Sequence, residues 1–201
     1  MLIGDVMTTD LVTVTSTAPL SDMRGLMDTR RVRRLPVVEN GELVGLVTRN
    51  ALEREFSSLL STLAAKDIMV TNLVTTSPDA TVEEGVALAQ ARRVGALLVV
   101  KDDRLVGIAT TNDFFYKLLN PILGIGLPGV RLSVSNFSGA PDLENILHIT
   151  NKLGLDVITM FTMTRPDTGQ RLFTLHLDTD EPSVVLAELR KHGYEVEARA
   201  R

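Results

Sequence analysis

The chain contains the stretch Gly107-Ile108-Ala109-Thr110-Thr111-Asn112-Asp113, which is typical of a buried strand that runs into a helix. Thr110 falls where the strand ends, and Asp113 falls in the first helical turn. A threonine hydroxyl, backbone N–H groups and a carboxylate three positions on therefore meet at one helix N-terminus. Two interpretations are open: a helix cap, the common role of such a pattern, or a pocket in which Asp113 accepts hydrogen bonds from a sugar diol.

The surroundings of this stretch occur twice in the chain. Asp5-Val6-Met7 overlays on Asp67-Ile68-Met69, and the same shift continues without a gap through a whole unit. It superposes Leu11-Val12-Thr13 on Leu73-Val74-Thr75, Arg30-Arg31-Val32 on Arg92-Arg93-Val94, Val37-Val38 on Val99-Val100, Leu43-Val44-Gly45 on Leu105-Val106-Gly107, and Thr48 on Thr110. Such register indicates an internal duplication.

Each copy predicts the order strand, helix, strand, strand, helix. The first helix begins near Pro19 in one copy and is capped by Thr81 in the other, and Asn40-Gly41 favours a tight hairpin turn. The expected elements are strands 11–14 and 73–76, strands 35–38 and 97–100, strands 43–47 and 105–109, and closing helices 50–60 and 112–119. One copy has too little core to stand alone, so we expect the two to pack together and leave a cleft.

The motifs V-M-T, R-L-P-V-V, N-G-E-L-V-G-L-V-T and G-I-A-T-T-N-D resemble a pair of CBS domains, a Bateman module, over residues 1–120. The resemblance implies a cleft that binds an adenine nucleotide (AMP, ADP or ATP) or S-adenosylmethionine. Strand backbone and apolar side chains would hold the base, the T-x-x-D aspartate would take the ribose hydroxyls, and basic residues would contact phosphate.

Carried over residue by residue, this resemblance implies a better site at the second copy. Asp113 lies three positions after Thr110 in the second copy, whereas Ala51 lies three positions after Thr48 in the first copy. The arginines before residue 35 are either a solvated helix end or phosphate ligands. The expected nucleotide-binding residues are Arg33, Arg34, Thr48, Thr75, Thr81, Val99, Ile108, Thr110, Asn112 and Asp113.

The composition excludes several other classes of function. The net charge is −4 and neither half is basic, so nucleic acid is not an expected partner. There are no cysteines and the three histidines do not have metal-site spacing, so no metal is expected. No apolar run is long enough for a membrane helix and the N-terminus does not resemble a signal peptide, so we expect a cytoplasmic protein without a membrane partner.

The last third of the chain follows a different plan. Residues 121–129 are rich in Gly and Pro and are expected to break the preceding helix and form a linker. Residues 130–201 predict a βαββαβ order, a ferredoxin-like plan. After the CBS pair this resembles an ACT domain, the arrangement of the AcuB-like (acetoin utilisation) group. Gly139 lies near the place of that family's amino-acid-binding loop. Amino-acid binding and plain dimerisation both stay open.

These patterns together predict an α/β (α+β) protein with CBS repeats at 1–60 and 61–120, a linker at 121–129 and an ACT-like domain at 130–201. No nucleophile set, carboxylate pair or phosphate-cradling glycine loop is recognisable, so we expect no enzyme. The leading hypothesis is a regulatory protein, a homodimer with an unidentified regulated partner, that senses an adenine nucleotide. The alternatives are an amino-acid sensor through the ACT-like domain and a dimerisation module with empty CBS clefts.

Overall fold

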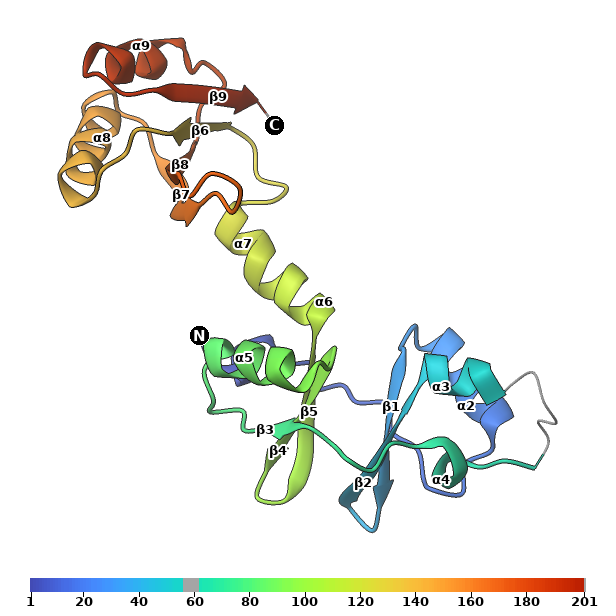
Figure 1. Cartoon of the computed structure of the whole chain (residues 1–201). Coiled ribbons are helices and arrows are strands. Elements are labelled where there is room, and N and C mark those ends of the chain that lie inside the picture. The colour runs from blue at the N-terminus through green and yellow to red at the C-terminus, as the bar shows by residue number, and fades with distance from the viewer. Residues whose placement is uncertain (56–61, 201) are drawn as a thin grey trace. The chain divides into compact units, whose positions relative to one another are not determined.

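The computed structural model describes residues 1–55 and 62–200, which form two units, Met1–Phe115 and Tyr116–Arg201 (Figure 1). Among the described residues, no helix is both long enough and apolar enough to cross a membrane. The elements of the first unit are α1(Ile3–Val6), α2(Leu20–Thr29), β1(Arg34–Glu39), β2(Glu42–Thr48), α3(Arg49–Glu55), α4(Ala65–Ile68), β3(Thr75–Thr76), α5(Val82–Arg92), β4(Ala96–Lys101), β5(Arg104–Thr110) and α6(Thr111–Asp113).

The duplicated order of elements is confirmed except for the predicted strand 11–14, which does not form a regular strand. β1 and β2 form one antiparallel hairpin, and β4 and β5 form the other. β3 pairs parallel with β4, and in the first repeat a single parallel bridge from Val14 to Val37 stands in its place. Asn40 and Gly41 both have positive φ, at 50° and 89°, as the predicted tight turn requires. The predicted helix 50–60 is seen as α3, and its residues 56–60 lie outside the described residues.

The first segment of each repeat packs on the other repeat. Ile3 of α1 is fully buried against Val99 and Ala109 of the second repeat. Ala65 of α4 is likewise buried in the core of the first repeat, and its N–H donates to the Ala18 carbonyl at 2.9 Å. Figure 1 shows α4 beside the first hairpin. The repeats therefore complete each other's cores, and the sequence boundary near residue 60 does not separate two complete cores.

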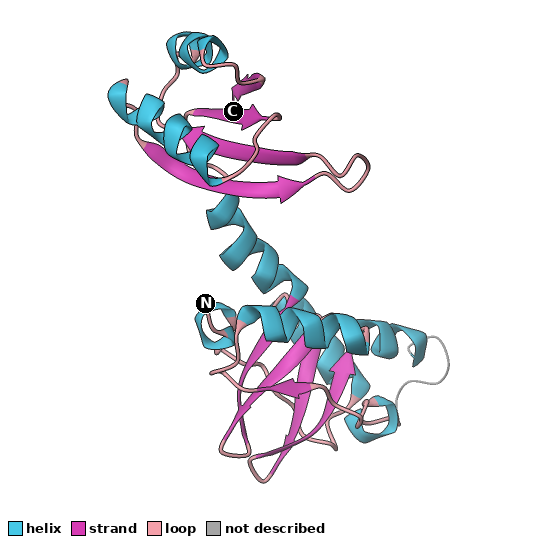
Figure 2. Cartoon of the chain, turned by 60° about the vertical axis from the view of Figure 1, so that its left-hand side comes forward, coloured by secondary structure: helices cyan, strands magenta, loops and turns pink. Residues whose placement is uncertain are grey.

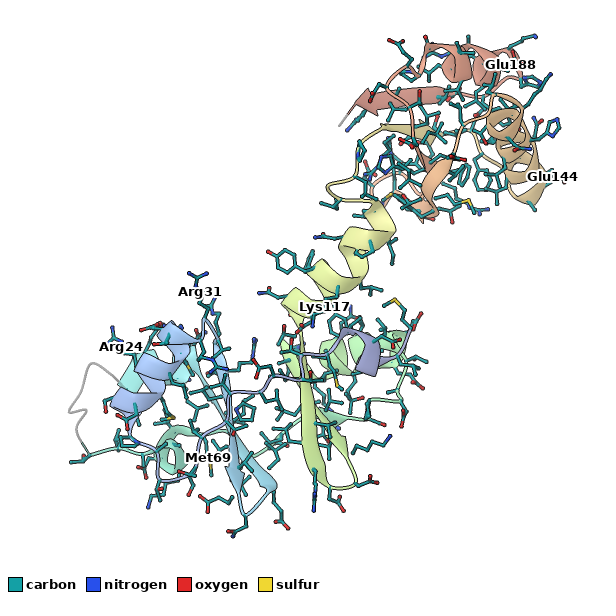
Figure 3. The ribbon with its side chains drawn as sticks, turned by 180° about the vertical axis from the view of Figure 1, so that it is seen from behind. Arg24, Arg31, Met69, Lys117, Glu144 and Glu188 are labelled. Carbon is teal, nitrogen blue, oxygen red and sulfur yellow. The ribbon has the colours of Figure 1, made fainter. Side chains whose placement is uncertain are left out.

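Two glycines allow this exchange of segments. Gly45 on β2 lies under the side chain of Met69, and Gly107 on β5 lies under that of Met7. Figure 3 shows Met69 beside the first repeat, although Met69 belongs to the opening segment of the second repeat in the sequence. A Cβ at either glycine would overlap the methionine sulfur, so each strand needs glycine where the opening segment of the other repeat crosses it.

The two repeats also share an apolar interface between their hairpins. Ala96, Leu98 and Ile108 form its buried centre. Partly buried leucines from both repeats pack around them, namely Leu11, Leu43, Leu46, Leu73 and Leu105. The two sheets thus face each other, as the duplication predicts.

The predicted closing helix 112–119 is longer than expected, although it does end within the segment 121–129. After α6 the chain continues as the π-helical segment η1(Phe114–Leu119) and then as α7(Asn120–Leu123). Pro121 stands within the first two positions of α7, where a missing N–H is tolerated. The helix ends at Gly124, which has a left-handed φ of 60°.

The second unit has the predicted βαββαβ order, with β6(Val130–Val134), α8(Ala140–Lys152), β7(Val157–Thr164), β8(Arg171–Leu177), α9(Ser183–Lys191) and β9(Val196–Ala200). All neighbouring strands are antiparallel, in the order β7-β8-β6-β9 (Figure 2). Ile146 on α8 and Leu189 on α9 are fully buried against the sheet, while Glu144 and Glu188 lie on the outer sides of these helices (Figure 3).

The segment predicted as a linker packs on this second unit. The Pro128 carbonyl lies 2.7 Å from Nε2 of His176 on β8, and Arg131 donates to the Leu123 carbonyl. A Cβ on Gly129 would overlap the Leu177 carbonyl. These contacts hold residues 123–129 against the strands of their own unit.

Candidate functional site

Two adjoining cavities lie between the repeats, within the first unit. The arginine cavity, of about 300 Å³, is lined by Arg33, Arg34, Thr48, Arg49, Asn50, Thr110, Thr111 and Asn112. The apolar slot, of about 200 Å³, is lined by Arg34, Leu46, Thr48, Val70, Asn72, Leu73, Val74, Val94, Gly95, Ala96 and Leu98. Because Arg34 and Thr48 line both cavities, the two spaces meet at these side chains.

The arginine cavity lies at the ends of β2 and β5, which are the second strands of the two hairpins. Thr48 ends β2 and Thr110 ends β5, and a short helix begins directly after each. The Thr48 hydroxyl accepts from the Ala51 N–H at 3.2 Å, and the Thr110 hydroxyl accepts from the Asp113 N–H at 3.3 Å. The duplicated caps thus bring matching polar chain segments from both repeats to one cavity.

Arg33 and Arg34 give this cavity its charge. Neither forms an ion pair with any carboxylate in the part of the chain that the structure describes. Burial, and then the nearby charge of Arg33, lower the pKa of Arg34. Both effects disfavour the charged guanidinium, and an anion in the cavity would relieve them.

The third arginine of the cavity is already paired. Arg49 donates to Asp28 at 2.7 Å, and its other terminal nitrogen lies 3.9 Å from Glu53. Arg49 is therefore partly neutralised, and Arg33 and Arg34 are the stronger anion-binding groups.

Arg34 reaches across the cleft to the second repeat. A Cβ built on Gly95 would lie 2.8 Å from an Nη atom of Arg34 and 3.6 Å from the Thr111 hydroxyl. Glycine at position 95 therefore gives the guanidinium its place at the boundary of the two cavities. The apolar slot beyond it has aliphatic walls with Asn72 as a polar group, which suits a flat ring with a few polar edges.

The Asp113 carboxylate is engaged within the protein. It is 8% exposed and accepts from the Thr8 hydroxyl at 2.8 Å. Its other oxygen accepts from the Thr110 N–H at 2.8 Å and from the Thr110 hydroxyl at 2.6 Å. Asp113 does not line either described cavity, and the cap interpretation accounts for its contacts.

The structure brings part of the expected site together. Arg33, Arg34, Thr48, Thr110 and Asn112 line the arginine cavity.

The remaining expected residues lie elsewhere in the first unit. Val99 is fully buried in the core under α1, and Ile108 is in the interface between the repeats. Thr81 caps α5, accepting from the Glu84 N–H at 3.2 Å, and Thr75 lies on β3. None of these residues lines either described cavity.

The sequence reasoning missed several residues of the two cavities. Examples are Asn50 and Thr111, which neighbour the predicted threonines, and the slot residues Val70 and Asn72. The duplication could have indicated the last two, because they follow Ile68-Met69, the counterpart of Val6-Met7 at the start of the first repeat. Within residues 1–55 and 62–200, no three His, Cys, Asp or Glu side chains cluster as a metal site would.

A duplicated strand-helix-strand-strand-helix unit with a cleft between its copies defines a module of paired CBS repeats. The chain belongs to the CBS domain family, whose model matches residues 3–58 and 65–120, more than half of the chain.

A solved structure of a putative acetoin utilization protein (AcuB) from Vibrio cholerae is 32% identical, with a TM-score of 0.55. The match covers 60% of this chain and 91% of that one. The CBS domain pair of protein MJ0100, solved in complex with 5-methylthioadenosine and S-adenosyl-L-methionine, is 23% identical with a TM-score of 0.54, over 60% of this chain and 96% of that one. At this identity the second likeness shows the shared fold.

Among curated proteins, inosine-5′-monophosphate dehydrogenase of Thermoplasma acidophilum is 30% identical over 76% of this chain and 30% of its own length. The CBS domain-containing protein YhcV of Bacillus subtilis is 29% identical over 73% of this chain and 95% of its own length. The chain spans about a third or less of the length of the dehydrogenases that it matches.

Proposed function

We propose that this chain is a non-catalytic regulatory protein that binds an adenine nucleotide, AMP, ADP or ATP, between its CBS repeats. The single observation that carries the proposal is the junction of the apolar slot with the arginine cavity at Arg34 and Thr48. An apolar slot suits a base and a pair of unpaired guanidinium groups suits phosphate, and a nucleotide joins these two chemistries in one molecule.

The charge of the site favours nucleotides over S-adenosylmethionine. Arg33 and Arg34 are unpaired cations at the end of the slot, and none of the described residues lining either cavity is acidic. A sulfonium cation would be repelled there, whereas phosphate would be attracted. In this proposal Thr48, Thr110 and Asn112 offer hydroxyl and amide groups near the phosphates, and Asp113 holds the Thr110 cap in position.

The regulatory role follows from the walls of the site. Arg33 and Thr48 come from the first repeat, whereas Val74 and Thr110 come from the second. A ligand that contacts both walls stabilises one arrangement of the repeats over others, and this preference is what a regulated partner would read.

Titration calorimetry with AMP, ADP and ATP tests the proposal. We expect saturable binding by the full chain and a loss of about tenfold in affinity for Arg34→Gln, because the variant removes a charge-assisted hydrogen bond. Arg104→Gln is the matched control, since Arg104 is an exposed arginine at the start of β5 that does not line either cavity. Absence of heat with all three nucleotides, or equal affinity for the two variants, contradicts the proposal.

We also propose that the chain acts as a homodimer through its second unit. Strand β7 is an edge of the sheet and carries the exposed side chains Met160 and Met163. An exposed apolar edge strand favours pairing with a second chain. Sedimentation of the wild type and of Met160→Lys/Met163→Lys tests this: we expect a dimer that the double variant dissociates, and a monomeric wild type contradicts it.

A further inference from the structure

The two edges of the cleft differ in the residue that could grip a ribose. The second repeat ends its T-x-x-D pattern with Asp113, whereas the first repeat has Ala51 at the matching position. A carboxylate is the group best suited to accept hydrogen bonds from both hydroxyls of a ribose. The presence or absence of a free carboxylate at each edge therefore decides whether the sugar is recognised.

The edge that has the carboxylate does not present it to a ligand. Both oxygens of Asp113 accept hydrogen bonds from the protein, from Thr8 on one side and Thr110 on the other. The Thr8 backbone also pairs with Ile108, at 2.9 and 3.0 Å, which fixes its hydroxyl beside the carboxylate. A ribose would have to displace the Thr8 hydroxyl to reach Asp113.

The other edge is open but has no carboxylate. Val70 pairs with Leu46 as Thr8 pairs with Ile108, and Val70 lines the apolar slot. Ala51 there supplies only a methyl group, and none of the described residues that line the slot or the arginine cavity is acidic. A ligand at this edge contacts aliphatic side chains, hydroxyls, amides and guanidinium groups.

A second asymmetry shows why the open edge is the one beside Thr48. Gly95 and Ala96 line the slot there. By the repeat register, Arg33 and Arg34 hold at the Asp113 edge the positions that Gly95 and Ala96 hold at the Thr48 edge. Small residues therefore leave space for a base at one edge, and the large side chains opposite them supply the positive charge.

We infer that the site selects its ligand by base and phosphate and does not recognise the 2′-hydroxyl of the sugar, so that it takes ribonucleotides and 2′-deoxyribonucleotides alike. This inference rests on the proposed function and adds the ligand class to it. One nucleotide lies at the Thr48 edge of each chain, with its base in the slot and its phosphate at Arg33 and Arg34.

Calorimetry of the full chain with AMP and 2′-deoxy-AMP tests the inference. The expected dissociation constants agree within about threefold, because a lost hydrogen bond to a charged group would cost about tenfold or more. A preference for AMP greater than this overturns the inference while the proposed function stands. If neither compound binds, and ADP and ATP do not bind either, the proposed function fails and the inference fails with it.

Ala51→Asp provides a second measurement on the same site. A carboxylate at position 51 can accept from the Thr48 N–H and hydroxyl as Asp113 does from Thr110, and Val70 has no hydroxyl to occupy its other oxygen. We expect this variant to prefer AMP over 2′-deoxy-AMP by about tenfold. If the variant binds AMP without gaining this preference, the sugar does not lie near position 51 and the inference is overturned.

Asp113→Asn is the matched control. It keeps the shape of the cap and removes the charge at the edge whose carboxylate is already engaged. The ratio of the two dissociation constants should stay at the wild-type value. A change of more than about threefold in this ratio would mean that Asp113 contacts the sugar, against the inference.

Discussion

Replacing Asp113 with alanine should destabilise the first unit strongly. The variant removes the acceptor of hydrogen bonds from the Thr8 hydroxyl, the Thr110 N–H and the Thr110 hydroxyl, at 2.8, 2.8 and 2.6 Å. Hydrogen bonds to a charged group are worth about 1.5–3 kcal/mol each. Water can replace part of this set, because Thr8 and Thr110 are themselves only half-buried. We expect a loss of roughly 3 kcal/mol in the free energy of unfolding.

The matched control is Asp67→Ala. The Asp67 carboxylate also caps a helix, accepting from the Ala64 N–H at 2.8 Å, but this hydrogen bond is exposed. Its loss should cost about 0.5–1 kcal/mol. The difference between the two variants measures what the hydroxyls of Thr8 and Thr110 add to the hydrogen bond with the backbone N–H.

The composition of the chain provides an assay that separates the two units. The protein has no tryptophan, and both tyrosines, Tyr116 and Tyr194, belong to the second unit. Tyrosine fluorescence therefore follows the second unit, whereas far-ultraviolet circular dichroism follows both. For a unit of this size 1 kcal/mol corresponds to about 4 °C in melting temperature. Asp113→Ala should therefore lower the melting temperature of the first unit by roughly 12 °C.

Two results would refute this reasoning. Equal destabilisation by Asp113→Ala and Asp67→Ala would mean that the hydrogen bonds from the hydroxyls of Thr8 and Thr110 add nothing. An unchanged melting temperature together with a loss of AMP affinity greater than about tenfold would mean that the carboxylate contacts the ligand rather than holding the fold.

Further predictions concern packing and pH. Gly107→Ala should destabilise the first unit by about 1–3 kcal/mol in urea unfolding, because the new methyl group overlaps the Met7 side chain. The control Gly25→Ala should not destabilise it, because no atom lies within 4 Å of a Cβ at that position. In the second unit, the hydrogen bond from the Ser138 hydroxyl is the main cause that lowers the pKa of Asp142. Its stabilisation is complete above the ordinary aspartate pKa and is lost as the pH falls through the lower folded value, so Asp142→Asn should flatten the acid decline of tyrosine-monitored stability. An unchanged acid decline in this variant would contradict the assignment.

Local chemistry made much of the fold predictable. Positive φ at Asn40 and Gly41, and the cap at Thr81, follow from properties of those residues alone. The exchange of α1 and α4 between the repeats could not be predicted, because an apolar stripe does not specify which core it joins. The chain continues from the π-helical segment η1 through Pro121 into α7, which the helix-breaking tendency of proline does not indicate.

The chemistry of the site could be predicted from the sequence, but the positions of its residues could be predicted only in part. The threonines at the strand ends and the arginines before β1 do line one cavity. The environment of Asp113 depends on Thr8, which is 105 positions away in the chain, and no pattern near Asp113 reveals this contact. The duplicated register indicated both edges of the cleft and the difference between Gly95 and Arg33, while the cavities that these residues line had to be seen in three dimensions.

The exchange of opening segments has a practical consequence for anyone who wishes to divide this molecule. A fragment that stops near residue 60 lacks α4, so the buried surface that receives Ala65 would face water. The complementary fragment would lack Ile3 and expose the pocket formed by Val99 and Ala109. The halves are thus poor candidates for separate expression, but they are natural partners for a split-reporter pair, because each carries the missing piece of the other.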